Sequence, residues 1–313
     1  MQVPTFELAG LSKSPAEFRD PDCEFRDPAR FGVVNCLSLS GFHRIAYAEW
    51  GPADADEVVV CVHGLTRQGR DFDVLAARLA DTGYRVICPD LVGRGRSDWL
   101  GAALDYVFPQ YCADMGSLLA MIGPKRVHWV GTSLGGMIGI VLAALPRSPL
   151  ATLTVNDIGP EVPFRASARV AARLLGDPIS YASHDALIAH MRKIYVGCGP
   201  LSDAQWRQMA HHSVRRDATT SRLVPLTAPR IATAFQWLWY YNMPLWSYWN
   251  KLKSPVLALH GDRSDFVTPD LLKRMKRATP ALATFEVADT GHMPMLMSRA
   301  ETNAVLRFLR LHS

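Results

Sequence analysis

The sequence of 313 residues lacks any hydrophobic run long enough to cross a membrane. Its longest apolar stretch, MIGIVLAAL at 137–145, has nine residues, whereas a membrane-spanning helix needs about 20. The first residues, MQVPTFELAG, also lack the basic region and apolar stretch of a signal peptide. We therefore expect a soluble protein with no membrane partner.

Cysteine is sparse, and its spacing matches no known framework. None of the six cysteines forms a CxxC pair, and no H-x-x-x-H spacing suggests zinc. Cys61 and Cys88 lie in apolar runs, where a reduced cysteine behaves as a small hydrophobic residue. We expect a reducing, cytoplasmic location and neither a metal nor a cofactor. The six are Cys23, Cys36, Cys61, Cys88, Cys112 and Cys198.

The sequence also lacks a strong excess of charge. The formal net charge is +5, and the densest basic stretch, KRMKR at 273–277, alternates with apolar residues in a predicted helix. This pattern is typical of a solvated helix face, so we expect no nucleic-acid partner. Hydrophobic residues make up 49% of the chain, which is enough for a large buried core.

Buried strands and amphipathic helices alternate along most of the chain. Apolar, β-branched runs that end in glycine are typical of strands buried on both faces, and such strands alternating with helices predict an α/β fold with a mostly parallel central sheet and helices on both faces. The pattern predicts strands at 33–41, 43–51, 57–64, 84–90, 126–131, 150–157, 254–262 and 283–289. It predicts helices at 72–83, 111–123, 137–146, 269–278 and 300–312.

The alternation stops between residues 160 and 250, where helices follow one another with no clear strand. We interpret this region as a helical cap inserted into the α/β core. The N-terminal residues are polar, and they repeat the motif EFRDP. We therefore expect an N-terminal arm at 1–30, a first core segment at 31–158, the cap at 159–251 and a second core segment at 252–313.

The stretch WVGTSLGG predicts a catalytic nucleophile at Ser133. Glycine costs about 1 kcal/mol relative to alanine inside a helix, so Gly131, Gly135 and Gly136 need a steric reason. A strand, G-x-S-x-G and a helix together form a nucleophile elbow, in which the turn is too sharp for side chains at the glycines. Oγ of Ser133 would then point outward at the carboxyl edge of the sheet, where open α/β sheets bind ligands.

A serine nucleophile needs a base, and His292 is the best candidate. It lies between the last predicted strand and the last helix, at the same sheet edge as Ser133. His128 and His260 lie in or at the end of strands, and His211 and His212 are adjacent on a helix and cannot converge. The histidines that compete with His292 are His43, His63, His128, His184, His190, His211, His212, His260 and His312.

The third group should orient the imidazole. HGDRSDFVTPD, after the strand at 254–262, offers Asp262 and Asp265, and Asp157 after the strand at 150–157 is an outside candidate. An oxyanion hole needs two backbone N–H groups. Leu134, next to the nucleophile, supplies one, and the HGLTR loop at 63–67 supplies the other through Leu65.

These residues resemble the α/β-hydrolases, in particular the capped subgroup of esterases, lactonases, carbon–carbon bond hydrolases and proline iminopeptidases. The resemblance covers residues 33–313 and rests on four motifs in order: HGLT at 63–66, PDLVGRGRSD at 89–98, VGTSLGG at 130–136 and TGHMP at 290–294. It implies the α/β-hydrolase fold and the order Ser133, Asp265, His292. Haloalkane dehalogenases and epoxide hydrolases of this subgroup carry aspartate in place of the serine, so the resemblance disfavours those activities.

The chain departs from the family pattern at two places. The family usually places its acid three residues after the glycine that ends the strand, where this chain has Ser264, and Asp265 follows one residue later. The spacing from Asp265 to Pro269 matches the family, so we choose Asp265 and explain the difference by a longer loop. HGLTRQG lacks the proline or extra glycines common in the family, which leaves open whether Leu65 or Thr66 donates the second N–H.

Several other residues are interpreted as structural. Arg67 can reach a substrate carboxylate, but we favour a local ion pair with Asp71, four residues on. Arg94, Arg96 and Asp98 are expected to brace their loop. The tryptophan-rich stretch at 235–249 is interpreted mainly as packing between cap and core, with one or two rings lining an acyl pocket.

The sequence therefore predicts a cofactor-free serine hydrolase that cleaves small-molecule carboxylic esters of small or medium acyl groups through an acyl-enzyme. Two alternatives stay open. One is a carbon–carbon bond hydrolase acting on a diketone-like acid, and the other is a non-catalytic small-molecule receptor on the same fold.

Overall fold

A computed structural model of the chain describes residues 25–123, 125–235 and 244–313. Its centre is an eight-stranded sheet with the order β1-β2-β4-β3-β5-β6-β9-β10. The strands are β1 (Arg30–Ser38), β2 (Gly41–Trp50), β3 (Glu57–Val62), β4 (Arg85–Pro89), β5 (Arg126–Thr132), β6 (Leu150–Asn156), β9 (Val256–Gly261) and β10 (Ala283–Val287).

The sheet is parallel except at one edge. β1 and β2 form an antiparallel hairpin whose turn includes Gly41 at a φ of 116°, and β2 is antiparallel to β4. From β4 to β10 every neighbouring pair is parallel. The alternating hydrophobic pattern of the hairpin and the continuous apolar runs of the parallel strands agree with this arrangement. The α/β class and the mostly parallel sheet predicted from the sequence are confirmed.

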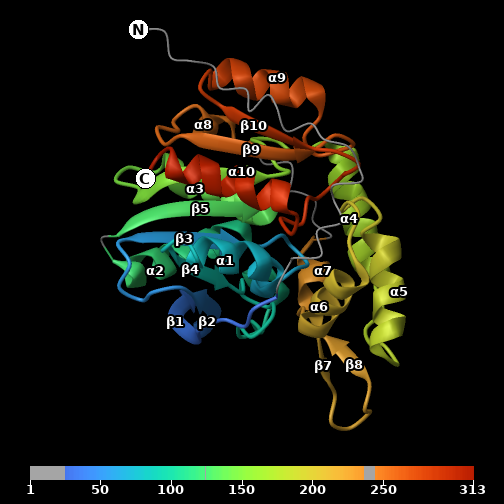
Figure 1. The fold of residues 1–313 in the computed structure, drawn as a ribbon. Coiled ribbons are helices and arrows are strands. Elements are labelled where there is room, and N and C mark those ends of the chain that lie inside the picture. Colours follow the sequence, from blue (N-terminus) through green and yellow to red (C-terminus); the bar gives the residue numbers. More distant parts are fainter. Residues whose placement is uncertain (1–24, 124, 236–243) are drawn as a thin grey trace, which may run out of the picture.

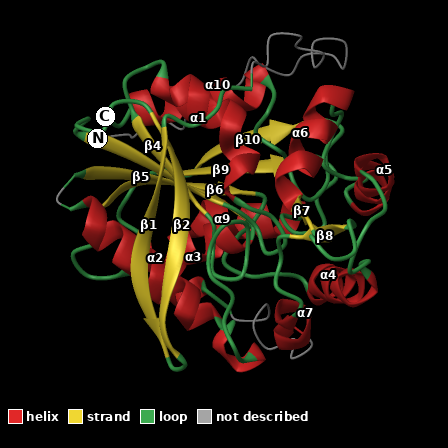
Figure 2. Ribbon diagram, turned by 90° about the horizontal axis from the view of Figure 1, so that it is seen from below, coloured by secondary structure: helices red, strands yellow, loops and turns green. Residues whose placement is uncertain are grey.

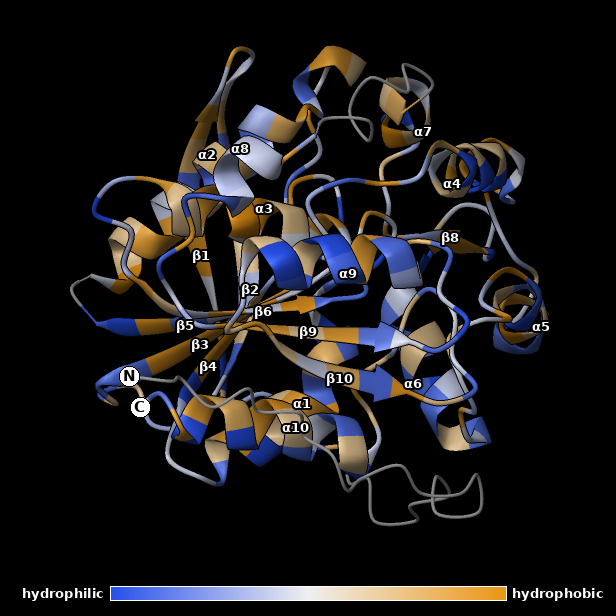
Figure 3. Ribbon diagram, turned by 90° about the horizontal axis from the view of Figure 1, so that it is seen from above, coloured by the Kyte–Doolittle hydropathy of each residue, from blue (hydrophilic) through white to orange (hydrophobic). Residues whose placement is uncertain are grey.

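Helices cover both faces of the sheet (Figure 1). Viewed along the sheet, α1 and α10 lie on one face, and α2, α3 and α9 lie on the other (Figure 3). The bounds are α1 (Asp73–Ala80), α2 (Phe108–Ile122), α3 (Leu134–Ala144), α9 (Pro269–Ala278) and α10 (Arg299–Arg310).

Each face of the sheet has its own apolar core. Leu75 of α1 and Val305 of α10 pack with Val59 of β3 on one face. Met137 of α3 and Trp129 of β5 belong to the larger core on the other face. Because both faces are packed, the strands that carry the active-site loops are held rigidly.

The region between β6 and β9 forms a helical insertion at one side of the sheet (Figure 2). It also contains a small antiparallel hairpin, so the expectation that it holds no strand is wrong. The hairpin pairs Val214 with Pro225, and three-residue strands of this size leave little hydrophobic pattern to read. The elements are α4 (Phe164–Gly176), α5 (His184–Ile194), α6 (Asp203–Ser213), β7 (Val214–Arg216), β8 (Leu223–Pro225), α7 (Arg230–Phe235) and α8 (Trp246–Trp249).

Of the predicted N-terminal arm, the structure describes only residues 25–30, and the first EFRDP copy lies outside the described residues. The described part contacts the core, since Arg26 donates to Ala77 O and its own carbonyl accepts from Trp50 Nε1. Among the described residues, no helix is both long and apolar enough to span a bilayer.

Candidate active site

Ser133 lies in the turn between β5 and α3, in the conformation expected of a nucleophile elbow. Its backbone has a φ of 50° and a ψ of −113°, which is strained for any residue other than glycine. A Cβ added to Gly131 would lie 2.3 Å from the carbonyl oxygen of Gly135, and one added to Gly135 would lie 2.0 Å from that of Val62. The glycines are therefore required because three backbone segments cross at this turn.

The imidazole of His292 is paired with Asp157. Nδ1 of His292 lies 2.7 Å from Oδ2 of Asp157, and the Asp157 side chain is fully buried. A carboxylate can only accept, so Nδ1 carries the proton and Nε2 keeps its lone pair as a base. Asp157 follows directly on β6, and its own backbone has a φ of 53°.

Two further donors hold the Asp157 carboxylate in place. The Gly261 N–H at the end of β9 donates to Oδ1 at 3.1 Å, and the Ser264 hydroxyl donates to Oδ2 at 2.9 Å. Ser264 in turn accepts from the N–H groups of Phe266 and Val267. These donors fix the orientation of the carboxylate toward Nδ1 of His292.

Asp265, chosen from the sequence as the acid, does not contact His292. Its side chain is 49% exposed and makes a bidentate ion pair with Arg169 of α4, with Nη2–Oδ1 at 2.8 Å and Nε–Oδ2 at 3.1 Å. The prediction of Asp265 is therefore corrected to Asp157. The physical reason is Ser264, which occupies the position of the family acid and turns its hydroxyl toward the carboxylate supplied by β6.

The His292 ring is also fixed by stacking. Phe266 lies parallel to it, with the ring centroids 3.6 Å apart and an angle of 14° between the planes. The guanidinium of Arg169 lies over the Phe266 ring, 5.9 Å from its centroid. Asp265 thus positions Arg169 over the Phe266 ring, and Phe266 in turn stacks on the imidazole of His292.

Ser133 and His292 line the same small hollow of about 40 Å³. α4 contributes Arg169 and Arg173 to this hollow, and Tyr195 follows α5. The sequence did not indicate Arg173 or Tyr195, because helical periodicity does not reveal which cap residues face the nucleophile. The insertion therefore lies against the predicted catalytic residues.

The predicted oxyanion donors lie next to Ser133: Leu65 and Thr66 line the same hollow, and Leu134 follows Ser133 in the chain. Within the part of the chain that the structure describes, the N–H groups of Leu65, Thr66 and Leu134 donate to no protein acceptor. Leu65 and Leu134 are buried, so an oxyanion can satisfy these donors. The choice between Leu65 and Thr66 for the second donor stays a prediction.

Two buried side chains brace the loop that carries these donors. Arg94 is fully buried and donates from Nε to Leu65 O at 2.9 Å. His63 accepts from the Leu91 N–H at Nε2 and therefore donates from Nδ1 to Gly64 O. Burial lowers the pKa of His63 to about 3, so this imidazole stays neutral and structural.

The other residues interpreted as structural also make local contacts. Arg67 makes a buried bidentate pair with Asp71, with both N–O distances at 2.6 Å, as predicted. Asp98 pairs with Arg44, and Arg96 lies over the Phe31 ring. Asp262, the other acid of the loop after β9, braces the turn, since its Oδ1 accepts from Thr290 N–H at 2.9 Å.

The model of the alpha/beta hydrolase family matches residues 59–305, which include every predicted catalytic residue. The chain belongs to the α/β-hydrolase family. The family resemblance and the fold class predicted from the sequence are thereby confirmed.

The relatives of this α/β-hydrolase are mainly hydrolases. The 3-hydroxybutyrate-oligomer hydrolase of Cupriavidus necator is 37% identical over 279 residues, covering 87% of this chain and 94% of the relative. A haloalkane dehalogenase of Mycobacterium marinum is 26% identical over 256 residues, covering 78% and 82%. A crystal structure of an alpha/beta hydrolase from Novosphingobium aromaticivorans superposes with a TM-score of 0.78 at 27% identity, covering 90% and 98%. These similarities support hydrolase activity for this chain.

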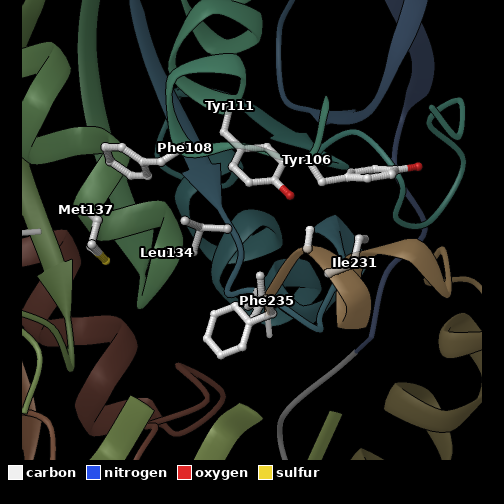
Figure 4. A pocket seen from close by; sticks show the side chains of 9 residues that line it. Tyr106, Phe108, Tyr111, Leu134, Met137, Ile231 and Phe235 are labelled. Atoms are coloured by element: carbon white, nitrogen blue, oxygen red, sulfur yellow. The ribbon is translucent and has the colours of Figure 1, made fainter. Parts of the chain in front are cut away.

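A second, apolar hollow of this hydrolase adjoins the elbow (Figure 4). Leu134 and Met137 of α3 line one side, and Phe235 and Ile231 of α7 line another. Of the tryptophan-rich stretch, residues 236–243 lie outside the described residues. Trp246 donates to Glu161 from Nε1, and Trp249 is buried in the larger core, so both pack structurally.

One cluster in this hydrolase has metal-ligand chemistry. The ligand atoms of Cys36, His43 and Asp114 lie within 4.8 Å of one another, and all three side chains are buried. Burial and the Asp114 charge raise the pKa of the Cys36 thiol to about 12, which opposes the thiolate that a metal requires. His43 Nε2 pairs instead with Asp114 at 3.0 Å, and we interpret the cluster as a hydrogen-bonded part of the core.

Proposed function

We propose that this α/β-hydrolase is a serine esterase with the triad Ser133, His292 and Asp157. The observation that carries the proposal is the Asp157–His292 pair, whose imidazole lines one hollow together with Ser133 of the strained elbow. A histidine held in one tautomer beside an elbow serine is the arrangement of acyl-transfer enzymes.

In the first half of the reaction, Oγ of Ser133 attacks the ester carbonyl and transfers its proton to Nε2 of His292. The carbonyl oxygen becomes an oxyanion that accepts from Leu134 N–H and from the N–H of Leu65 or Thr66. The C–O bond to the leaving alcohol then breaks, and the alcohol departs with the proton from Nε2. Asp157 stabilises the imidazolium that forms between these two transfers.

In the second half, water attacks the acyl-enzyme. Nε2 of His292 accepts a proton from the water, the bond between the acyl carbon and Oγ breaks, and the proton returns to Ser133. The products are a carboxylic acid and the free enzyme. No step in this scheme requires a metal or cofactor.

The apolar hollow beside the elbow supports a preference for small or medium acyl groups. Its cavity volume is about 20 Å³, which is room for roughly one water-sized group. Tyr106 and Phe108 close it on the side opposite α7. A long acyl chain cannot enter without moving these rings.

The substrate class we propose is a short oligoester of a 3-hydroxy acid. The support is the 37% identical relative, named a 3-hydroxybutyrate-oligomer hydrolase, which aligns over 87% of this chain. Each link of such an oligomer is a carboxylic ester between small units, which matches the serine chemistry.

The test is hydrolysis of linear 3-hydroxybutyrate dimer and trimer, followed by chromatography, beside p-nitrophenyl esters of two to twelve acyl carbons. We expect turnover of the oligomers, a maximum at short esters and a burst of p-nitrophenol, all lost in Ser133→Ala. Absence of a burst and of turnover would favour a receptor. Turnover confined to a ring-fission dienoate would favour the carbon–carbon bond hydrolase.

A further inference from the structure

Three arginines lie near Ser133 and His292, and they differ in how their charge is matched. Arg67, Arg169 and Arg173 all line the hollow that holds the two catalytic residues. Arg67 forms a bidentate ion pair with Asp71, and Arg169 forms one with Asp265.

Arg173 has no such partner among the described residues. Its Nη2 donates to the Thr66 hydroxyl at 2.7 Å, and its guanidinium lies over the Tyr195 ring, 5.0 Å from the centroid. Its Nε is buried and forms no hydrogen bond with any residue that the structure describes. Among the described acids, the nearest is Asp177, whose Oδ2 is 4.0 Å from that nitrogen and whose Oδ1 accepts from His190 at 3.1 Å.

Arg173 lines the hollow around Ser133, which adjoins a larger cavity. This cavity of about 490 Å³ lies between the insertion and the core, and it shares Thr66, Arg67, Ile194 and Tyr195 with the hollow. Arg173 contacts two of these shared residues, Thr66 and Tyr195. A substrate that extends from Ser133 into the larger cavity therefore lies against side chains that Arg173 contacts.

A shielded cation without a carboxylate at hydrogen-bond distance among the described residues favours an anionic ligand. The Arg173 side chain is only 17% exposed, so its charge is weakly screened by water. Guanidinium groups bind carboxylates through paired, charge-assisted hydrogen bonds. A neutral ester has no carboxylate to form these charge-assisted hydrogen bonds with Arg173.

We propose that Arg173 binds the free carboxylate of the substrate, so that the enzyme prefers ester acids to neutral esters and cleaves oligomers from the carboxyl end. This inference rests on the proposed function, because Ser133 must cut the ester next to the bound unit. Arg173 is a specificity residue in this account, and the Thr66 hydroxyl and the Tyr195 ring hold it in position.

The test compares cleavage of the internal ester in two substrates, the linear 3-hydroxybutyrate dimer as its free acid and the same dimer as its methyl ester. The wild-type kcat/KM should be higher for the free acid. Arg173→Gln should lower kcat/KM for the free acid about 10- to 100-fold, mainly through KM, and change it less than about threefold for the methyl ester. The kcat/KM of Arg173→Lys for the free acid should lie between those of wild type and Arg173→Gln, since lysine keeps the positive charge but lacks the paired donors of a guanidinium.

Arg169→Gln is the matched control, because it removes an arginine four residues away on the same helix whose charge is already paired. It should change the ratio of acid to methyl ester by less than about threefold. The proposal is overturned if wild type shows no preference for the free acid, or if Arg173→Gln lowers kcat/KM equally for the two substrates. It is also overturned if Arg169→Gln removes the preference for the free acid as Arg173→Gln does. Circular dichroism establishes that each variant is folded, and Arg173→Lys carries the test if Arg173→Gln does not fold.

Binding separates failure of this inference from failure of the proposed function. Calorimetric titration of Ser133→Ala with the dimer acid and its methyl ester reports on the subsite without turnover. Tighter binding of the acid, lost on combining Ser133→Ala with Arg173→Gln, supports the subsite even if wild type cleaves neither substrate. Equal binding of the two dimers contradicts it even if wild type is an esterase.

Discussion

The Asp157 carboxylate lies 2.7 Å from Nδ1 of His292, although the two residues are 135 positions apart in the sequence. Asp157 follows β6, and His292 lies in the loop after β10. Because β9 lies between these two strands, the pair closes over the end of β9, where Gly261 donates to the same carboxylate.

Replacing Asp157 by asparagine should lower kcat at least 100-fold. An amide facing Nδ1 favours the wrong imidazole tautomer, which in the serine proteases lowers kcat about 10⁴-fold. Asp265→Asn should lower kcat less than about tenfold, since Asp265 contacts Arg169 and not the imidazole. Steady-state kinetics on a short p-nitrophenyl ester measure both effects.

Thermal unfolding of each variant is the control, because a folded and inactive Asp157→Asn isolates the chemical effect. If Asp265→Asn abolished turnover while Asp157→Asn remained active, the assignment of the acid to β6 would be wrong.

The strands and helices of the core could be predicted from the sequence, because buried parallel strands have continuous apolar runs such as EVVVCV at 57–62. Ser133 could also be predicted, since the close approach of backbone segments at the elbow requires glycines on both sides of the serine. From the sequence, Asp157 ranked below Asp265 as an outside candidate, because an acid at a strand end and an acid in the next loop differ only in which one the fold brings to the histidine. The sequence signal was Ser264, a hydroxyl at the position of the family acid, whose role becomes clear only beside Asp157.

Gly135→Ala should disturb the elbow. The added Cβ would lie 2.0 Å from Val62 O, so either β3 or α3 must move. We expect the free energy of unfolding to fall by about 1–3 kcal/mol and kcat to fall at least tenfold. Urea denaturation and ester hydrolysis measure the two effects.

Gly116→Ala is the matched control for that change. Gly116 lies inside α2, and a Cβ there would meet no described atom within 4 Å beyond the neighbouring backbone of its own helix. Alanine should therefore raise the free energy of unfolding by up to about 1 kcal/mol and leave kcat unchanged. Equal effects of the two substitutions would contradict the steric account of the elbow.

His63 should make stability depend on pH. Burial lowers its pKa to about 3 in the folded protein, whereas the unfolded chain has a pKa near 6.5. The unfolded state therefore binds the additional proton between these values, and the stability from the neutral imidazole is lost as the pH falls from 6.5 toward 3. His63→Gln, which can still accept from Leu91, removes this dependence.

The stability advantage of wild type over His63→Gln should therefore shrink by about 2 kcal/mol between pH 7 and pH 5. Urea denaturation at both values measures it. Burial raises the pKa values of Asp73 and Asp90 to about 6, so these two groups make the folded state more stable as the pH falls. Both are present in wild type and in His63→Gln, so their effect cancels in the difference. A difference that stays constant with pH would show that His63 titrates normally in the folded state.

The central claim, that Ser133 is the nucleophile of a serine hydrolase, is tested most directly by labelling with a fluorophosphonate and mapping the adduct by peptide mass spectrometry. The account predicts one adduct per chain, on the peptide that contains Ser133, with loss of ester hydrolysis in proportion to labelling. Ser133→Ala should show neither adduct nor turnover while remaining folded. Undiminished labelling and turnover in Ser133→Ala would contradict the account.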